Sequence, residues 1–98
     1  MPTAADSCAA KLRVLADPTR LEVMRLLGAE PRLVSELRAA LRIEQSLLSH
    51  HLRVLRDAGL VRSETEGQNR RYFLVSSRAH GGAVDLGCCQ LTFHDRPQ

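Results

Sequence analysis

Cysteine has the most distinctive chemistry in this sequence, because a thiolate can bind a soft metal ion, react with an oxidant or form a disulfide. The 98-residue chain contains three cysteines: Cys88 and Cys89 are adjacent near the C-terminus, and Cys8 lies near the N-terminus. An odd number of cysteines, without a secretion signal in the first residues, favours reduced thiols or ligands over a disulfide framework. The sequence therefore predicts a cytoplasmic protein with reduced thiols.

The residues alone leave three roles open for the adjacent cysteines. They can hold a metal or metalloid ion, since vicinal thiols suit soft ions, although they lack a defining ligand spacing. They can be reactive thiols that sense oxidants or reactive sulfur, although a disulfide between neighbours is strained. They can also be small buried hydrophobes in a short strand between Val84 and Phe93.

A second set of chemical groups repeats at helical spacing in residues 45–58. Leu48, Leu52 and Leu55 form one apolar stripe, and His51 falls on the same inner half, where we expect it to pack or cap rather than bind a ligand. The opposite face carries hydrogen-bonding side chains: Gln45, Ser46, Ser49, His50 and Arg53. Glutamine can pair with adenine, serine with several bases, and arginine with guanine or phosphate. Such a face can approach the base edges of DNA, although ordinary solvated helices have a similar composition.

Two arginines stand beside a predicted turn. Arg70 and Arg71 follow the turn residues 67–69 at the start of the second strand of a predicted β-hairpin. Cations near the tip of a hairpin can reach phosphates or the minor groove of DNA. Because neighbouring residues on a strand point to opposite faces, we expect only one of the two arginines to contact DNA.

The elements that position these groups follow from apolar periodicity and capping residues. Asp6 or Ser7 is expected to begin a first helix, and Asp17 followed by Pro18 to begin a second that ends at Gly28. The second helix is thus predicted over 18–28. Further helices are predicted over 34–41 and 45–58, with an extended link at 31–33 and a turn at 42–44. Strands are predicted over 60–66 and 70–75, and no helical pattern follows residue 76.

The amino-acid composition limits the classes of function that this protein can have. The net charge is +3, and thirteen of the fourteen basic residues are arginine, which fits a polyanionic partner. One tyrosine, two phenylalanines and no tryptophan predict an aliphatic core and leave no aromatic platform for single-stranded nucleic acid. No apolar run is long enough to cross a membrane. Motifs for phosphate-binding loops, metalloproteases and nucleophile elbows are absent, so we do not expect an enzyme.

Four segments, in this order and spacing, resemble the ArsR/SmtB family of bacterial repressors. They are LADPTRLEVMRLL, SELRAAL, QSLLSHHLRVLRDAGLV and EGQNRRYFLV, within a resemblance that covers about residues 9–76. The resemblance implies a mainly α, α+β winged helix-turn-helix fold. It also implies a homodimer that binds a palindromic operator in double-stranded DNA without a cofactor and leaves it when an inducer binds. We predict that bases are read by Gln45, Ser46, Ser49 and His50 and phosphates held by Arg53, Arg70 and Arg71.

The sequence departs from the family at two metal sites. The Cys-Val-Cys segment of many family sensors corresponds here to Leu33, Val34 and Ser35, so the arsenic, cadmium or lead site at that position is absent. A family zinc site on a long C-terminal helix is also not expected, because the acidic and histidine residues lack its spacing. These residues are His80, Asp85, His94 and Asp95.

The resemblance implies a different place for a ligand. In the family, the first helix and the C-terminal segment pack together at the dimer interface, which would bring Cys8 of one subunit to Cys88 and Cys89 of the other. Three thiolates suit arsenite, and a tetrahedral ion could recruit His94 as a fourth ligand. Zinc and cadmium are less favoured.

Together these observations predict a DNA-binding domain over residues 1–78 and a short inducer-sensing or dimer segment over 79–98. The predicted function is a dimeric repressor that a thiophilic ion such as arsenite releases from DNA. A repressor that senses redox state or reactive sulfur through its thiols, and a winged-helix regulator that senses nothing, are the alternatives.

Overall fold

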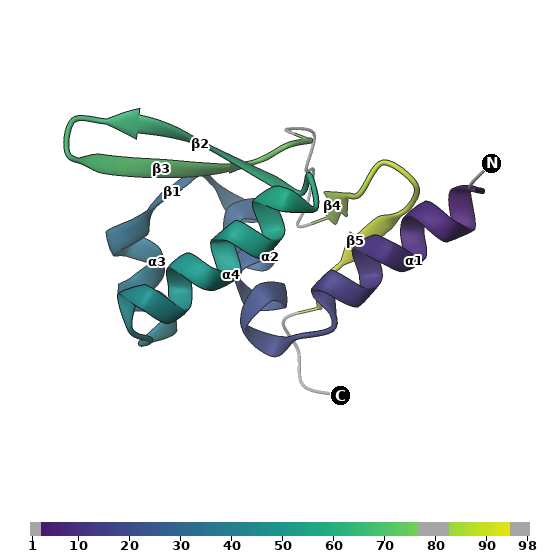
Figure 1. The fold of residues 1–98 in the computed structure, drawn as a ribbon, viewed down its shortest axis with the longest axis horizontal. Coiled ribbons are helices and arrows are strands. Elements are labelled where there is room, and N and C mark those ends of the chain that lie inside the picture. Colours follow the sequence, from purple (N-terminus) through teal and green to yellow (C-terminus); the bar gives the residue numbers. More distant parts are fainter. Residues whose placement is uncertain (1–2, 77–82, 95–98) are drawn as a thin grey trace.

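The computed structural model describes residues 3–76 and 83–94, in which four helices and five strands form (Figure 1). The elements are α1 (Ala4–Leu15), α2 (Pro18–Ala29), β1 (Arg32–Leu33), α3 (Val34–Leu41), α4 (Gln45–Asp57), β2 (Val61–Glu66), β3 (Asn69–Leu74), β4 (Ala83–Asp85) and β5 (Gln90–Thr92). The β2–β3 hairpin, called the wing below, and α1 lie at opposite ends of the longest axis. The predicted α+β architecture is confirmed. None of the described helices has the length and apolar composition needed to cross a bilayer.

Capping residues determine where the first two helices begin. The Thr3 hydroxyl accepts a hydrogen bond from the Asp6 N–H at 3.1 Å, and the Asp6 carboxylate accepts one from the Thr3 N–H at 3.0 Å. This reciprocal capping box starts α1 at Ala4, so the expectation that Asp6 or Ser7 would be the N-cap is wrong. The second start is confirmed: Asp17 accepts from the Arg20 N–H at 3.0 Å, and Pro18 is the first residue of α2.

Gly28 does not end α2, which continues to Ala29. A Cβ atom at Gly28 would lie 3.2 Å from Val84 Cγ2, which is tighter than an ordinary side-chain contact. Gly28 therefore allows β4 to approach α2 closely. The sequence predicted a helix end at Gly28 because nothing near this glycine indicates that β4, 56 positions later at Val84, packs against it.

Residues 31–33 are more than a link, since β1 joins the wing as a third strand. The sheet order is β1-β3-β2, and both pairings are antiparallel, with Leu33 opposite Arg71. The wing itself runs from Val61 opposite Leu74 to Glu66 opposite Asn69, around the two-residue turn 67–68. The predicted hairpin is confirmed, and its turn is one residue shorter than expected.

The described part of the C-terminal segment folds as a second, two-stranded antiparallel sheet in which Val84 lies opposite Leu91. Val84 and Leu86 are buried in the same cluster as residues of the helices. His80 and Asp95, which were not expected to form the family zinc site, lie outside the described residues. The described residues 83–94 therefore pack on the body of the molecule.

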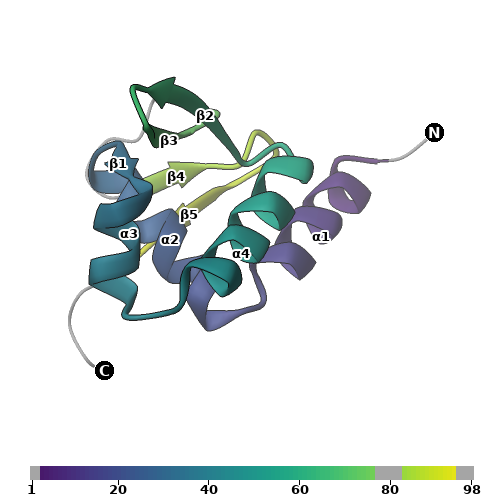
Figure 2. The ribbon, with the colours of Figure 1, turned by 60° about the vertical axis from the view of Figure 1, so that its left-hand side comes forward.

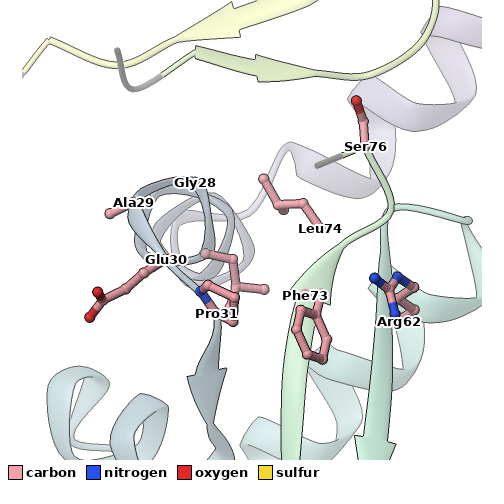
Figure 3. Close-up of a pocket in the computed structure, with 9 residues that line it drawn as sticks. Gly28, Ala29, Glu30, Pro31, Arg62, Phe73, Leu74 and Ser76 are labelled. Carbon is pink, nitrogen blue, oxygen red and sulfur yellow. The ribbon is translucent and has the colours of Figure 1, made fainter. Parts of the chain in front are cut away.

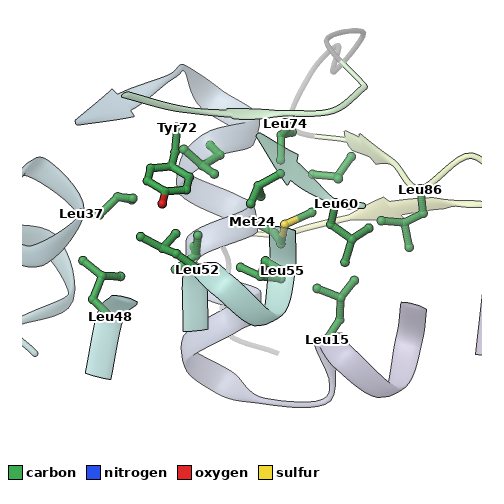
Figure 4. Packing of buried hydrophobic residues seen from close by; sticks show 14 residues of the cluster. Leu15, Met24, Leu37, Leu48, Leu52, Leu55, Leu60, Tyr72, Leu74 and Leu86 are labelled. Carbon is green, nitrogen blue, oxygen red and sulfur yellow. The ribbon is translucent and has the colours of Figure 1, made fainter. Parts of the chain in front are cut away.

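One aliphatic core joins all the layers, as predicted (Figure 4). Tyr72 is the single aromatic member of this buried cluster. The buried members are Leu15, Val23, Met24, Leu27, Leu37, Leu48, Leu52, Leu55, Leu60, Val61, Tyr72, Leu74, Val84 and Leu86. Because α2 lies at the centre of these contacts, it holds α4 and the sheets in fixed relative positions.

Candidate nucleic-acid interface and cysteine cluster

Helices α3 and α4 form the helix-turn-helix pair, joined by a short turn (Figure 2). Arg42 in this turn adopts a left-handed conformation with φ +56°, which reverses the chain. The inner side of α4 is buried through Leu48, Leu52 and Leu55. The predicted base-reading and phosphate-binding side chains of this helix are all exposed: Gln45, Ser46, Ser49, His50 and Arg53.

A groove of about 340 Å³ separates the N-terminal part of α4 from the wing. Gln45 and Ser49 line it from α4, and Arg70 lines it from β3. The structure therefore brings residues from two predicted DNA-contacting elements to one concave surface. Their role in binding DNA stays a prediction.

The two arginines of the wing lie on opposite faces. Arg70 shares the inner face with Tyr72, lines the groove, and donates a hydrogen bond from Nη1 to Ser63 Oγ at 3.0 Å. Arg71 points to the outer face, where its Nε donates to Glu66 Oε2 at 2.7 Å. This hydrogen bond raises the pKa of the Arg71 guanidinium. Arg70 is thus the wing arginine that faces α4, a choice the sequence left open.

Arg38 is a candidate that the sequence analysis missed. It is exposed on α3 and lines the same groove as Arg70 of the wing. Ser35, one turn earlier on α3, also lines it. The helical period places both residues away from the buried Leu37, and this was the available signal.

A smaller cavity of about 160 Å³ lies between the C-terminal end of α2 and the sheet (Figure 3). Pro31, Phe73 and Arg62 are among its lining residues. The Arg62 guanidinium lies 4.6 Å from the centre of the Phe73 ring and 3.0 Å from the Glu64 carboxylate. Its charge is therefore engaged on the outer face of the wing, and this cavity is separate from the groove beside α4.

The three cysteines converge in one chain and form what we call the sulfur cluster, with all sulfur atoms within 4.8 Å of one another. Cys8 and Cys88 form a disulfide across 80 positions of sequence. Cys89 keeps an exposed thiol whose sulfur lies 3.3 Å from that of Cys8 and 3.8 Å from that of Cys88. The expectations of reduced thiols and of a meeting between subunits are therefore wrong for this structure, because α1 and the β4–β5 hairpin of the same chain pack together.

His94 does not belong to this group. The sulfur loop, residues 86–89, joins β4 to β5, whereas His94 follows β5 at the other end of the hairpin, where Thr92 pairs with Ala83. The ligand atoms that converge in the described residues are the three sulfurs alone. The predicted fourth ligand is therefore not brought to the site.

His51 is buried on the inner side of α4, as predicted, and its Nδ1 atom has no hydrogen-bond partner among the described residues. Burial lowers the pKa of this imidazole, and the nearby charges of Arg20 and His50 act in the same direction against that of Asp17. The side chain therefore packs in the neutral form.

Comparison with known proteins agrees with this geometry. The family profile described as "Bacterial regulatory protein, arsR family" matches residues 17–63. The HTH-type transcriptional regulator NmtR of Mycobacterium tuberculosis is 42% identical over 76% of this chain and 62% of its own length. The arsenical resistance operon repressor of Bacillus subtilis is 36% identical over 81% of this chain and 76% of its own length. Among the first relatives, the chain thus spans about three fifths of NmtR and about half of the SmtB homolog of Synechocystis.

Solved structures of bacterial regulators have the same fold. HlyU from Vibrio cholerae superposes with a TM-score of 0.74 and is 33% identical, covering 81% of this chain and 86% of HlyU. Mb0332 from Mycobacterium bovis, described as a homodimeric winged helix-turn-helix DNA-binding domain, has a TM-score of 0.69 at 27% identity, covering 76% of this chain and 69% of its own. The fold is a winged helix-turn-helix, and the chain belongs to the arsR family of bacterial regulatory proteins.

Proposed function

We propose that this protein is a cytoplasmic transcriptional repressor that binds double-stranded operator DNA as a homodimer and needs no cofactor to do so. The observation that carries the proposal is the exposed, mostly uncharged outer face of α4 beside a groove lined by Arg38 and Arg70. A slim polar helix can enter a major groove, while cations beside it meet phosphates. We propose no catalytic activity.

The contacts divide between base reading and phosphate binding. Gln45, Ser46, Ser49 and His50 read base edges, and Arg53 and Arg70 hold phosphates. Arg71 faces away from the groove and is paired with the Glu66 carboxylate, so its replacement is expected to weaken DNA binding less than replacement of Arg70. Arg38 adds a phosphate contact from α3.

A homodimer would place two copies of α4 about one DNA turn apart on a two-fold operator. The homodimeric state named for Mb0332 supports this assembly. In our proposal residues 1–78 form the DNA-binding part, and residues 79–98 carry the sensing segment.

The sulfur cluster is the proposed effector site. Reduction of the disulfide would free three thiols whose sulfur atoms this structure holds within 4.8 Å of one another, and such a group could bind arsenite, a three-coordinate ion that prefers sulfur. The similarity to an arsenical resistance operon repressor supports this choice. Zinc and cadmium fit less well, because the described residues bring no fourth ligand to the three sulfurs.

The disulfide between Cys8 and Cys88 favours a second candidate, in which oxidation rather than arsenite releases the repressor. The two effector chemistries use different atoms. Arsenite would engage all three sulfurs, whereas oxidation to the disulfide uses only Cys8 and Cys88. The Cys89→Ser variant should therefore weaken release by arsenite and leave release by peroxide unchanged.

The test of DNA binding is a salt titration with operator and random duplexes, using Arg70→Ala and Arg62→Ala as matched variants of the wing. Arg70→Ala should lower affinity for both duplexes and reduce the slope of log affinity against log salt by about one. Arg62→Ala removes the same charge from the outer face and should change little. Equal losses in both variants would contradict the groove as the DNA-binding surface.

Base reading is tested with Gln45→Ala and His50→Ala on a panel of operator variants. These changes should alter which operator is preferred, by about 1–3 kcal/mol of discrimination for each lost bidentate contact. A uniform loss on operator and random DNA would contradict the division between base reading and phosphate binding.

A further inference from the structure

Lys11, the one lysine of the chain, belongs to α1, and its side chain reaches the sulfur loop. Its Nζ atom donates a hydrogen bond of 2.7 Å to the carbonyl oxygen of Leu86, two residues before Cys88. Lys11 follows Cys8 by three positions on α1, so both side chains project from the same face of the helix. The Lys11 ammonium group therefore contacts the sulfur loop at Leu86, and the Cys8 sulfur contacts it at Cys88 and Cys89.

We propose that Lys11 is the positioning residue of the sulfur cluster, holding the sulfur loop so that Cys88 and Cys89 meet Cys8. The sensing role of the cluster rests on the proposed function, but the positioning role concerns sulfur geometry alone. The proposal adds Lys11 to the site, as the residue that orients the sulfur atoms of Cys88 and Cys89 toward Cys8.

The sulfur loop is a compact unit that can be held from one point. The Leu86 N–H donates to the Cys89 carbonyl at 2.8 Å, and the Gly87 N–H donates to the Asp85 carboxylate at 2.7 Å. Gly87 has φ +89°, the left-handed turn that brings Cys88 and Cys89 back toward α1. Since Leu86 is tied to Cys89 by its N–H and to Lys11 by its carbonyl, the lysine sets the orientation of the whole loop.

The sulfur loop borders a cavity beside the lysine. This cavity of about 140 Å³ is lined by Lys11 and Gly87 and separates the loop from the base of the wing, where Leu60 and Val75 line it. Side chains that border a cavity lack contacts on that side. Leu86 is buried in the core, and the hydrogen bond from Lys11 adds a directional constraint where the loop borders the cavity.

Contact with DNA is not the role that this position supports. Helix α1, which carries Lys11, lies at the end of the molecule opposite the wing tip (Figure 1). Its ammonium group is half-buried against a carbonyl, whereas phosphate-binding cations project into solvent.

The test measures how readily Cys8 and Cys88 pair, in a Cys89→Ser background that prevents exchange among three thiols. The protein is equilibrated with glutathione and glutathione disulfide, so that two protein thiols are oxidised while one glutathione disulfide becomes two glutathione thiols. The disulfide fraction is then read by alkylation and mass spectrometry. Lys11→Met should lower the equilibrium constant for disulfide formation about tenfold, by analogy with the loss of metal affinity that follows removal of a residue that orients metal ligands.

Arg13→Met is the matched control, because it removes the same charge from an exposed position on α1 and should leave the constant unchanged. Lys11→Arg, which keeps a donor, should recover part of the loss, and Lys11→Gln gives a second disrupting variant. Circular dichroism of the reduced variants separates loss of positioning from loss of fold.

A constant within twofold of the parent in folded Lys11→Met and Lys11→Gln would overturn the proposal, as would an equal fall in Arg13→Met. Neither DNA nor arsenite takes part in this measurement. The effect of Lys11 on the disulfide would therefore still be measurable if the protein were not a repressor. Equally, failure of the Lys11 proposal would not contradict DNA binding.

Discussion

The two ends of this molecule are built by different kinds of contact. At the wing end, the candidate DNA-binding residues stand on α3, α4 and the β2–β3 hairpin, which are consecutive in sequence. At the sulfur end, the cluster forms only because residue 8 meets residues 88 and 89. A surface built from neighbouring elements persists whenever those elements fold. A cluster closed by a disulfide between residues 8 and 88 can be opened by chemistry at two sulfur atoms.

The largest expected effect tests whether the wing end depends on its own core. Leu55→Ala removes a fully buried side chain of α4 and should lower the free energy of unfolding by about 2–5 kcal/mol. The loss should be the same in oxidised and reduced protein, as measured by urea denaturation. Leu47→Ala, on the exposed side of the same helix, should stay within about 0.5 kcal/mol of the parent.

The next effect isolates the sulfur end. Cys8→Ser prevents closure of a loop of about 80 residues and should lower the free energy of unfolding by about 2–4 kcal/mol without reductant. With reductant, parent and variant should unfold alike. Cys89→Ser, which removes the unpaired thiol, should match the parent in both conditions. If the free energy of unfolding of the parent protein were the same with and without reductant, the disulfide would not contribute to the stability of the sulfur end.

A smaller effect concerns the joint between the two ends, where Asp17 caps α2. Asp17→Ala should cost about 0.5–2 kcal/mol of stability. The hydrogen bond from the Arg20 N–H lowers the pKa of Asp17 below its ordinary 3.8, against the effect of burial. The capping contribution is therefore present above pH 3.8 and disappears as pH falls through the lowered pKa. Asp57→Ala, an exposed aspartate at the end of α4, should show no such loss in the same pH series.

The smallest effect is the pH response of His51. Burial lowers its pKa below the ordinary 6.5, so below that pH the unfolded chain binds more protons than the folded one. The free energy of unfolding should therefore fall as pH drops below 6.5, and His51→Gln should remove this part of the fall. His50→Gln, on the exposed side of α4, should retain it. Parallel curves for His51→Gln and the parent would contradict the assignment.

Local patterns predicted most of the wing end. The periodicity of Leu48, Leu52 and Leu55 located α4 and its exposed face, and the turn near Gly67 located the hairpin. Whether Arg70 or Arg71 faces α4 depends on how the wing packs on the core, because both satisfy the same strand pattern.

The sulfur end was less predictable for a physical reason. The close approach of Val84 to Gly28, and the bond from Lys11 to Leu86, join segments more than 50 positions apart. Neither contact leaves a periodic signal in either segment. The family resemblance did bring the cysteines together, but across two subunits, since it assumed an interface in place of the intrachain hairpin.

The covalent link between Cys8 and Cys88 makes a ring of the polypeptide that contains the helix-turn-helix and the wing. A protease that cuts once at the wing tip would leave both fragments attached, and they would separate on a denaturing gel only after reduction. The oxidised protein would thus survive a nick as one covalent molecule, whereas the reduced protein would be held together by its packing alone.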